Sequence, residues 1–324
     1  MRSSFIRSAF YFNQTFRLAA RSRLFNRIVR QAWTKYRKPL FVTGGTTYAG
    51  FWSALYGSGD QKGKSAQASQ SIELQMADSH YKHNELEACY KILEKYESKS
   101  EDPEILWRLS RVLVDLGKNE TEPTKRKHFL QKAIELADKA LKNEGPFGSA
   151  NAHKWYAIAI KTLGQIEGDR FKQTFAVKVH LERALELSPF DAKIWHELGR
   201  WHFEAADYPI YKKWFKAILF NPPPSSTYEE ALRFFEKAEA AEPGIYHKAN
   251  YFYMGETLER LGRKNQAVDC YKKAFIVPVE TKEDQVIHQK VDEKLLKKYG
   301  INTLELPTGT EALLGIYQAK KEKK

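Results

Sequence analysis

Between Ile72 and Tyr299 the chain alternates stretches of helical hydrophobic spacing with short polar breaks. Within each stretch, apolar side chains recur every three or four residues, which is the spacing of one face of an α-helix. The breaks contain Pro, Gly or clusters of Asn, Asp and Glu, which commonly end helices. The pattern predicts paired helices around 77–81 and 86–93, 107–119 and 133–140, 155–164 and 181–189, 195–202 and 231–243, and 251–258 and 267–274, with a final helix at about 283–299.

The fourth and fifth pairs share one signature. An aromatic residue is followed after three and four residues by Leu-Gly or Met-Gly, and the second helix carries Ala, an aromatic residue and Ala at fixed spacing. This is the tetratricopeptide pattern, in which small residues let two helices approach closely. We therefore expect an all-α, tetratricopeptide-like helical-repeat solenoid over 72–300. Its framework positions are Trp195, Gly199, Ala231, Phe235, Ala238, Tyr251, Gly255, Ala267, Tyr271 and Ala274.

The fourth pair carries an insertion of about 20 residues, at 207–226, relative to the consensus spacing. Its apolar residues recur every four positions, which predicts an extra helix ending at Asn221, before three prolines. Two interpretations stay open. The apolar side packs on the concave face of the array, or aromatic and basic side chains line a groove for a ligand, a lipid or an acidic peptide. The candidate groove residues are Tyr211, Lys212, Lys213, Trp214, Phe215 and Lys216.

The net charge of +13 belongs mainly to the start of the chain. Residues 1–59 hold eight Arg, two Lys and no acid, whereas the remaining 43 Lys and Arg are nearly balanced by 40 Asp and Glu. Residues 1–38 are amphipathic and rich in Arg and Ser, as mitochondrial targeting segments are. The alternative is a basic arm that binds a membrane surface or an acidic partner. The candidate targeting residues are five of the eight leader arginines, Arg17, Arg21, Arg23, Arg27 and Arg30.

Residues 39–56 are uncharged and form a marginal membrane span or an interfacial segment, since Thr and Gly dilute their hydrophobicity. A polar linker of small residues follows at 57–71. Residues 301–324 form a C-terminal tail that ends in a basic run. Clustered lysines there could attract an acidic partner in a way that salt weakens.

The sequence shows no motif of catalysis, cofactor binding or metal binding. A phosphate-binding glycine loop, a nucleophile elbow and a His-Glu-x-x-His motif are all absent from the 324 residues. The two cysteines, Cys89 and Cys270, are far apart, which excludes a disulfide framework and a cysteine zinc site. Because the charge excess lies in the leader, it does not indicate nucleic-acid binding. We expect a non-enzymatic binding protein.

Residues 72–300 resemble the regulator of microtubule dynamics family, whose members share a divergent tetratricopeptide domain. Three segments carry the resemblance, Asp102–Leu109, His153–Ile158 and Asn221–Ala231, and the last, with its Pro-Pro-Pro-Ser-Ser-Thr-Tyr-Glu run, is the most specific. The resemblance implies association with tubulin, microtubules or their associated proteins. For some members it also implies residence on mitochondria or contact with other membranes.

These observations leave two functions from different classes. The first is an adaptor that binds microtubules or microtubule-bound proteins through its repeats and is positioned by its leader at mitochondria. The second is a mitochondrial membrane-anchored contact-site or lipid-binding protein, in which the insertion completes an apolar cavity. The expected location is mitochondrial, membrane-associated or imported after leader cleavage. The alternative location is the cytoplasm, cytoskeleton and spindle.

Overall fold

The computed structural model describes residues 61–168, 174–207, 225–242 and 248–306. The chain divides into two compact units, residues 1–64 and residues 65–324, and the description below concerns the second. The leader, the 39–56 segment, candidate groove residues 211–216 and most of the C-terminal tail lie outside the described residues. Among the helices that are described, none is both long and apolar enough to cross a bilayer.

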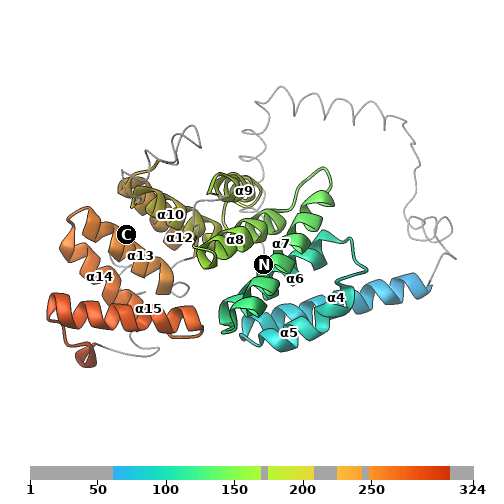
Figure 1. Cartoon of the computed structure of the whole chain (residues 1–324), viewed down its shortest axis with the longest axis horizontal. Coiled ribbons are helices and arrows are strands. Elements are labelled where there is room, and N and C mark those ends of the chain that lie inside the picture. Colours follow the sequence, from blue (N-terminus) through green and yellow to red (C-terminus); the bar gives the residue numbers. More distant parts are fainter. Residues whose placement is uncertain (1–60, 169–173, 208–224, 243–247, 307–324) are drawn as a thin grey trace, which may run out of the picture. The chain divides into compact units, whose positions relative to one another are not determined.

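Every regular element within these ranges is a helix, as the spacing of apolar residues predicted. In the described part of the chain the helices form consecutive pairs (Figure 1): α6 with α7, α8 with α9, α10 with α12, and α13 with α14, preceded by α4 and α5, which share one apolar cluster. Their bounds are α4 Gln61–Lys82, α5 Leu86–Leu93, α6 Pro103–Asn119, α7 Pro123–Lys142, α8 Ala150–Ile166, α9 Thr174–Leu187, α10 Ala192–Ala206, α12 Tyr228–Ala241, α13 Lys248–Arg260 and α14 Lys264–Ile276.

The last α-helix within the described ranges, α15, spans Lys282–Glu293 and lies against α13 and α14 (Figure 1). It continues into a π-helical turn at Lys294–Lys298, close to the final helix predicted at 283–299. Short 3₁₀ turns occupy Glu94–Tyr96 and Thr303–Glu305. Each pair packs on the next one along the chain, so the described part of this unit is a helical-repeat array and confirms the expected fold class.

Local sequence signals set where the helices begin. Asp102 precedes Pro103 and accepts a hydrogen bond from the Glu104 amide at 2.9 Å, which caps α6. Thr227 and Glu230 form a reciprocal capping box at the start of α12, and Thr281 and Asp284 do the same for α15. These caps satisfy amide groups that have no partner inside the helix.

Two glycines allow close contact within the fourth and fifth pairs. A Cβ atom on Gly199 of α10 would lie 2.6 Å from the ring of Phe235 on α12. A Cβ atom on Gly255 of α13 would lie 2.5 Å from the ring of Tyr271 on α14. Both rings are completely buried. The absence of a side chain at each glycine therefore lets an aromatic ring of the second helix rest directly on the backbone of the first.

The core runs through the array as clusters shared between neighbouring pairs. Buried apolar side chains of α4 to α8, of α8 to α10 and of α10 to α15 form three such clusters. Both cysteines lie in these clusters as free thiols. Burial raises the pKa of the Cys89 thiol to about 11 and that of the Cys270 thiol to about 12.

Candidate protein-interaction surface

A cluster of ion pairs connects the first helices of several repeats with α15. On α10, Lys193, Glu197, Arg200 and Glu204 follow one another at spacings of four, three and four residues, which places them on one helix face. Their ion-pair partners come from α8 and α15, and Lys118 of α6 adds longer-range attraction to the carboxylates. We call the following set the charged network: Asp115, Lys118, Lys161, Lys193, Glu197, Arg200, Glu204 and Glu283.

The centre of the charged network is a buried pair. Lys161 Nζ of α8 lies 2.8 Å from a carboxylate oxygen of Glu197 on α10, and the two side chains retain 9% and 5% of their exposed area. Burial raises the pKa of Glu197, but Lys161, Arg200 and Lys193 outweigh it and hold that pKa well below its usual range. Glu197 is therefore a carboxylate whose charge is neutralised by its neighbours.

Arg200 extends the network to α15. One of its terminal nitrogens lies 3.1 Å from Glu283 Oε1 of α15, and its guanidinium sits 4.8 Å from the ring centroid of Tyr253 on α13. Burial raises the pKa of Glu283, but Arg200, Lys118 and Lys193 outweigh it and lower this pKa to about 2. The buried Nε of Arg200 has no hydrogen-bond partner among the described residues.

The first turn of α15 also touches the first two pairs of the array. Lys282 Nζ donates to the backbone carbonyl of Asn119, at the end of α6, at 2.6 Å. Just before the helix, the backbone carbonyl of Glu280 accepts a hydrogen bond from the Asn84 side chain at 3.0 Å. Residues separated by 163 and 196 positions are thus in direct contact.

A second cluster of aromatic and basic residues adjoins the network at α4 and α6. Asp78 pairs with Arg108 at 2.9 Å and with Arg111 at 2.6 Å. The Arg111 guanidinium lies 3.7 Å from the ring centroid of Tyr81, whose hydroxyl donates to Asp115 at 2.5 Å. Since Asp115 also pairs with Lys118 of the charged network, the two clusters are continuous.

The two ends of the insertion are held together beside this array. The Tyr228 hydroxyl donates to Asp207 Oδ1 at 2.9 Å, and Arg260 of α13 donates to the same hydroxyl at 3.0 Å. Arg260 also pairs directly with Asp207. We call these three residues the clasp. Asp207 directly precedes the part of the insertion that is not described, and Tyr228 follows it, so the chain leaves and returns at one place.

The repeat framework residues of the sequence prediction lie in the core or next to it. Trp195 is half-buried, donates to the Pro189 carbonyl at 2.9 Å and packs at a tilt against the ring of Phe234. The other framework residues, Gly199, Ala231, Phe235, Ala238, Tyr251, Gly255, Ala267, Tyr271 and Ala274, are buried. They contribute packing, whereas the charged network was not anticipated from the sequence. The spacing of charged residues along one face of α10 could have indicated a charged helix face, but the residues that pair with this face are distant in sequence.

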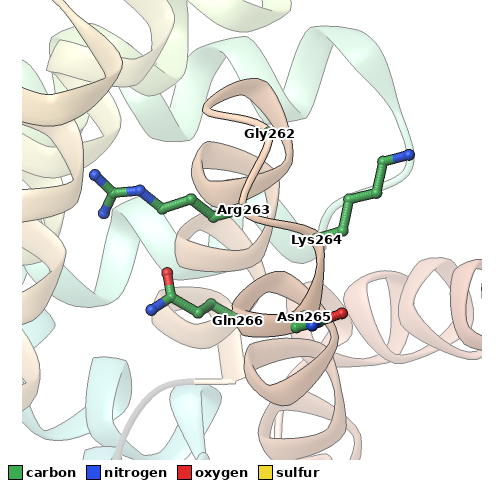
Figure 2. A pocket seen from close by; sticks show the side chains of 5 residues that line it. All are labelled: Gly262, Arg263, Lys264, Asn265 and Gln266. Atoms are coloured by element: carbon green, nitrogen blue, oxygen red, sulfur yellow. The ribbon is translucent and has the colours of Figure 1, made fainter.

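A hollow of about 500 Å³ lies at the turn between α13 and α14 (Figure 2). It is lined by the consecutive residues 262–266. In Figure 2 the side chains of Arg263 and Lys264 extend to opposite sides of the turn. Because the charged groups diverge, this hollow does not present a convergent ligand site. Within the described ranges, no three His, Cys, Asp or Glu side chains gather as metal ligands.

The sequence profile of the family described as regulator of microtubule dynamics protein 1-3 matches residues 73–300. The chain belongs to this family. Regulator of microtubule dynamics protein 1 of mouse is 39% identical over 225 residues, which covers 68% of this chain and 72% of the relative. The bovine protein 1 is 39% identical over 226 residues, covering 68% and 70%. The mouse protein 2 is 31% identical over 229 residues, covering 69% and 55%.

Among solved structures, a tetratricopeptide protein of Thermus thermophilus is similar with a TM-score of 0.47. It is 17% identical, and the similarity covers 70% of this chain and 98% of that one.

The segments that resemble this regulator family have defined places in the array. The Asp102–Leu109 segment supplies the cap of α6 and Arg108, which pairs with Asp78. In His153–Ile158, Lys154 pairs with Asp191 at 2.6 Å and so ties α8 to the cap of α10. The described end of Asn221–Ala231 supplies the capping box of α12 and the clasp residue Tyr228.

Proposed function

We propose that this chain is a non-enzymatic adaptor that associates with microtubules or with microtubule-bound proteins through its repeat domain. The observation that carries the proposal is membership of a family named for the regulation of microtubule dynamics, with the match extending over residues 73–300. The repeat array adds a physical basis. Partly exposed charged side chains from several helices, Lys118, Lys193 and Glu283, lie on it, and repeat surfaces recognise peptides through a few such anchors.

The proposal also assigns the positioning of the protein to its leader. Residues 1–38 have the composition of a mitochondrial address, and residues 39–56 would hold the chain at a membrane. Imaging the full chain beside a variant in which the five leader arginines are replaced by Gln tests this. Loss of the mitochondrial signal in the variant supports the address. A mitochondrial signal that the variant retains rejects the address. A cytoskeletal or spindle signal that is the same in the full chain and the variant favours the alternative location in the cytoplasm, cytoskeleton and spindle.

Co-sedimentation with microtubules tests the main proposal. The full chain, the leader variant and a Lys118→Gln/Arg200→Gln variant are pelleted with microtubules over a series of salt concentrations. Binding through the repeats predicts that the leader variant still co-sediments and that the repeat variant is weakened. If the leader variant alone loses all binding, the repeat domain does not carry the interaction. Salt should weaken binding through exposed charges.

A second function, contact with a lipid surface, is favoured by two exposed aromatic side chains. Phe147 and Phe190 retain 88% and 86% of their exposed area. Each follows a proline in the connection from the second helix of one pair to the first helix of the next. Exposed aromatics at loop tips suit a membrane interface. Liposome flotation and fluorescent-lipid transfer test this second function by comparing the parent chain with a Phe147→Ser/Phe190→Ser variant. Weaker flotation or slower transfer by the variant would support it, and equal results would exclude this role of the two side chains.

A further inference from the structure

Glu283 is a carboxylate held by cations from two other helices. Arg200 of α10 lies 3.1 Å away, and Lys118 of α6 and Lys193 of α10 add longer-range attraction that keeps the carboxyl ionised. Nevertheless, the Glu283 side chain retains 42% of its exposed area. Lys118 and Lys193 retain 30% and 33% of their exposed area, whereas Arg200 retains only 13%. A second carboxylate arriving from solvent can therefore reach the two lysines first, and it reaches Arg200 when Glu283 moves away.

The charge balance of the network depends on Glu283. The charged network as defined above contains four cations and four anions. Without Glu283 one cation is in excess, and Arg200 loses its closest carboxylate, while its Nε already has no partner among the described residues. A carboxylate supplied by another chain would restore neutrality at Arg200.

The first turn of α15 is held more weakly than the rest of the helix. Ile287, Val291 and Leu295 are buried against α13 and α14 and fix the body of the helix. The start is held by the ion pair of Glu283 with Arg200, by the Thr281–Asp284 capping box and by the hydrogen bonds of Lys282 and Asn84. Both the capping box and these two hydrogen bonds lie in exposed surroundings. The exposed hydrogen bonds contribute little net stability. The ion pair of Glu283 is therefore the main contact that a competing carboxylate has to replace for the first turn to yield while the apolar side stays packed.

We infer that Lys118, Lys193 and Arg200 form a binding surface for an acidic segment of a partner protein, and that Glu283 occupies this surface until the partner displaces it. The inference rests on the proposed function, because it names the chemistry of the partner that the repeat domain takes. The structure supports a carboxylate-bearing partner because the group that occupies the surface in this chain is itself a carboxylate on a helix beginning Lys-Glu-Asp. The surface is thus self-occupied in the isolated protein.

Fluorescence anisotropy with a labelled hexaglutamate peptide tests the inference on the full chain, with hexaglutamine as the uncharged probe. Glu283→Gln removes the internal competitor and should bind hexaglutamate about three-fold more tightly than the parent chain, the range expected for partly exposed ion pairs. Arg200→Gln and Lys118→Gln should each bind it more weakly. Glu293→Gln is the matched control, since Glu293 also lies on α15 but pairs with Lys297 in the turn that continues this helix.

The basic leader contributes equally to all these variants, so differences between them report on the repeats. A photo-reactive hexaglutamate should crosslink within residues 115–120 or 193–204 of the Glu283→Gln chain. Equal affinity of that variant and the parent, or crosslinks confined to residues 1–60, would overturn the inference. Circular dichroism melting shows whether each variant is folded. If Arg200→Gln does not fold, Lys118→Gln alone tests whether loss of a cation weakens hexaglutamate binding.

Co-sedimentation of Glu283→Gln with microtubules separates this inference from the proposed function. Tighter peptide binding without any microtubule binding would reject the proposed function alone. If the chain binds microtubules but the Glu283→Gln substitution leaves its affinity for hexaglutamate unchanged, only the inferred surface for an acidic segment is rejected.

Discussion

Gly255 of α13 faces the ring of Tyr271 on α14 so closely that a Cβ atom at the glycine would lie 2.5 Å from ring carbon Cε1. Tyr271 cannot easily move away, because it is completely buried and its hydroxyl donates to Glu256 at 2.7 Å. The contact between helices of the fifth pair is therefore set by the absence of a side chain at this position.

Replacing Gly255 with Val should lower the free energy of unfolding by about 2 kcal/mol, the cost typical of overpacking a closed core. Urea denaturation followed by circular dichroism measures it. Gln266→Val on α14 is the control, because it introduces the same β-branched residue at an exposed helix position and should change stability by less than about 0.5 kcal/mol. Equal effects of the two substitutions would contradict the contact.

The Lys161–Glu197 pair should behave as a buried ion pair. Lys161→Met leaves Glu197 enclosed without its closest cation and is expected to cost about 3 kcal/mol of stability. The double variant Lys161→Met/Glu197→Leu removes both charges and should recover most of that loss. Denaturation of the two single variants and the double variant gives the coupling energy. Strictly additive losses would show that the pair does not act as a unit.

The clasp should stabilise the base of the insertion locally. Tyr228→Phe removes the hydroxyl that joins Asp207 and Arg260, and a loss of about 1 kcal/mol is expected. Hydrogen exchange should speed up at the start of α12 and the end of α10, with little change in α6 and α7. Tyr156→Phe is the matched control, because it removes a hydroxyl on α8, where the Tyr156 ring packs on His180, and leaves the clasp intact. Protection unchanged by Tyr228→Phe would contradict the prediction.

Lys248 should make the free energy of unfolding change with pH in the alkaline range. Its side chain is buried, and its ammonium group donates to the Ala274 carbonyl at 2.6 Å, near the end of α14. Burial lowers the pKa of Lys248 from 10.5 to about 8, although Asp284 opposes the shift. Between these values the unfolded chain binds more protons than the folded one. The Lys248 contribution to stability therefore rises as pH increases from about 8 towards 10.5.

Comparison of the parent chain with Lys248→Met isolates this group from the other titrating residues. The stability difference between the two, measured by urea denaturation from about pH 7 to about pH 10, should shift in favour of the parent chain as pH rises. A difference that is constant with pH would show that Lys248 titrates at its ordinary pKa in the folded protein.

The fold followed from the sequence because helical periodicity and small residues act locally. Gly199 and Gly255 recur in the same register of two repeats, and the break at 119–123 coincides with the end of α6 at Asn119 and the start of α7 at Pro123. The insertion was also visible in the sequence, although candidate groove residues 211–216 lie outside the described residues, so their role stays a prediction.

The charged network could not be predicted in the same way. Lys193, Glu197 and Arg200 have the spacing of any solvated helix face, and nothing local distinguishes a solvated carboxylate from one enclosed by Lys161. The contact between Arg200 and Glu283 joins residues 83 positions apart, which only the arrangement of the repeats brings together. Long-range polar pairing is therefore the part of this surface that required the structure.

The burial of both cysteines makes the chain suitable for site-specific probes. Cys89 and Cys270 are buried, and their raised pKa values keep both thiols protonated at neutral pH, so electrophilic reagents, which react with the thiolate, should modify them slowly. A cysteine introduced at an exposed position such as Gln285 would then be modified selectively in the otherwise unaltered protein. Fluorophores or spin labels placed this way could follow the first turn of α15 directly while a partner binds.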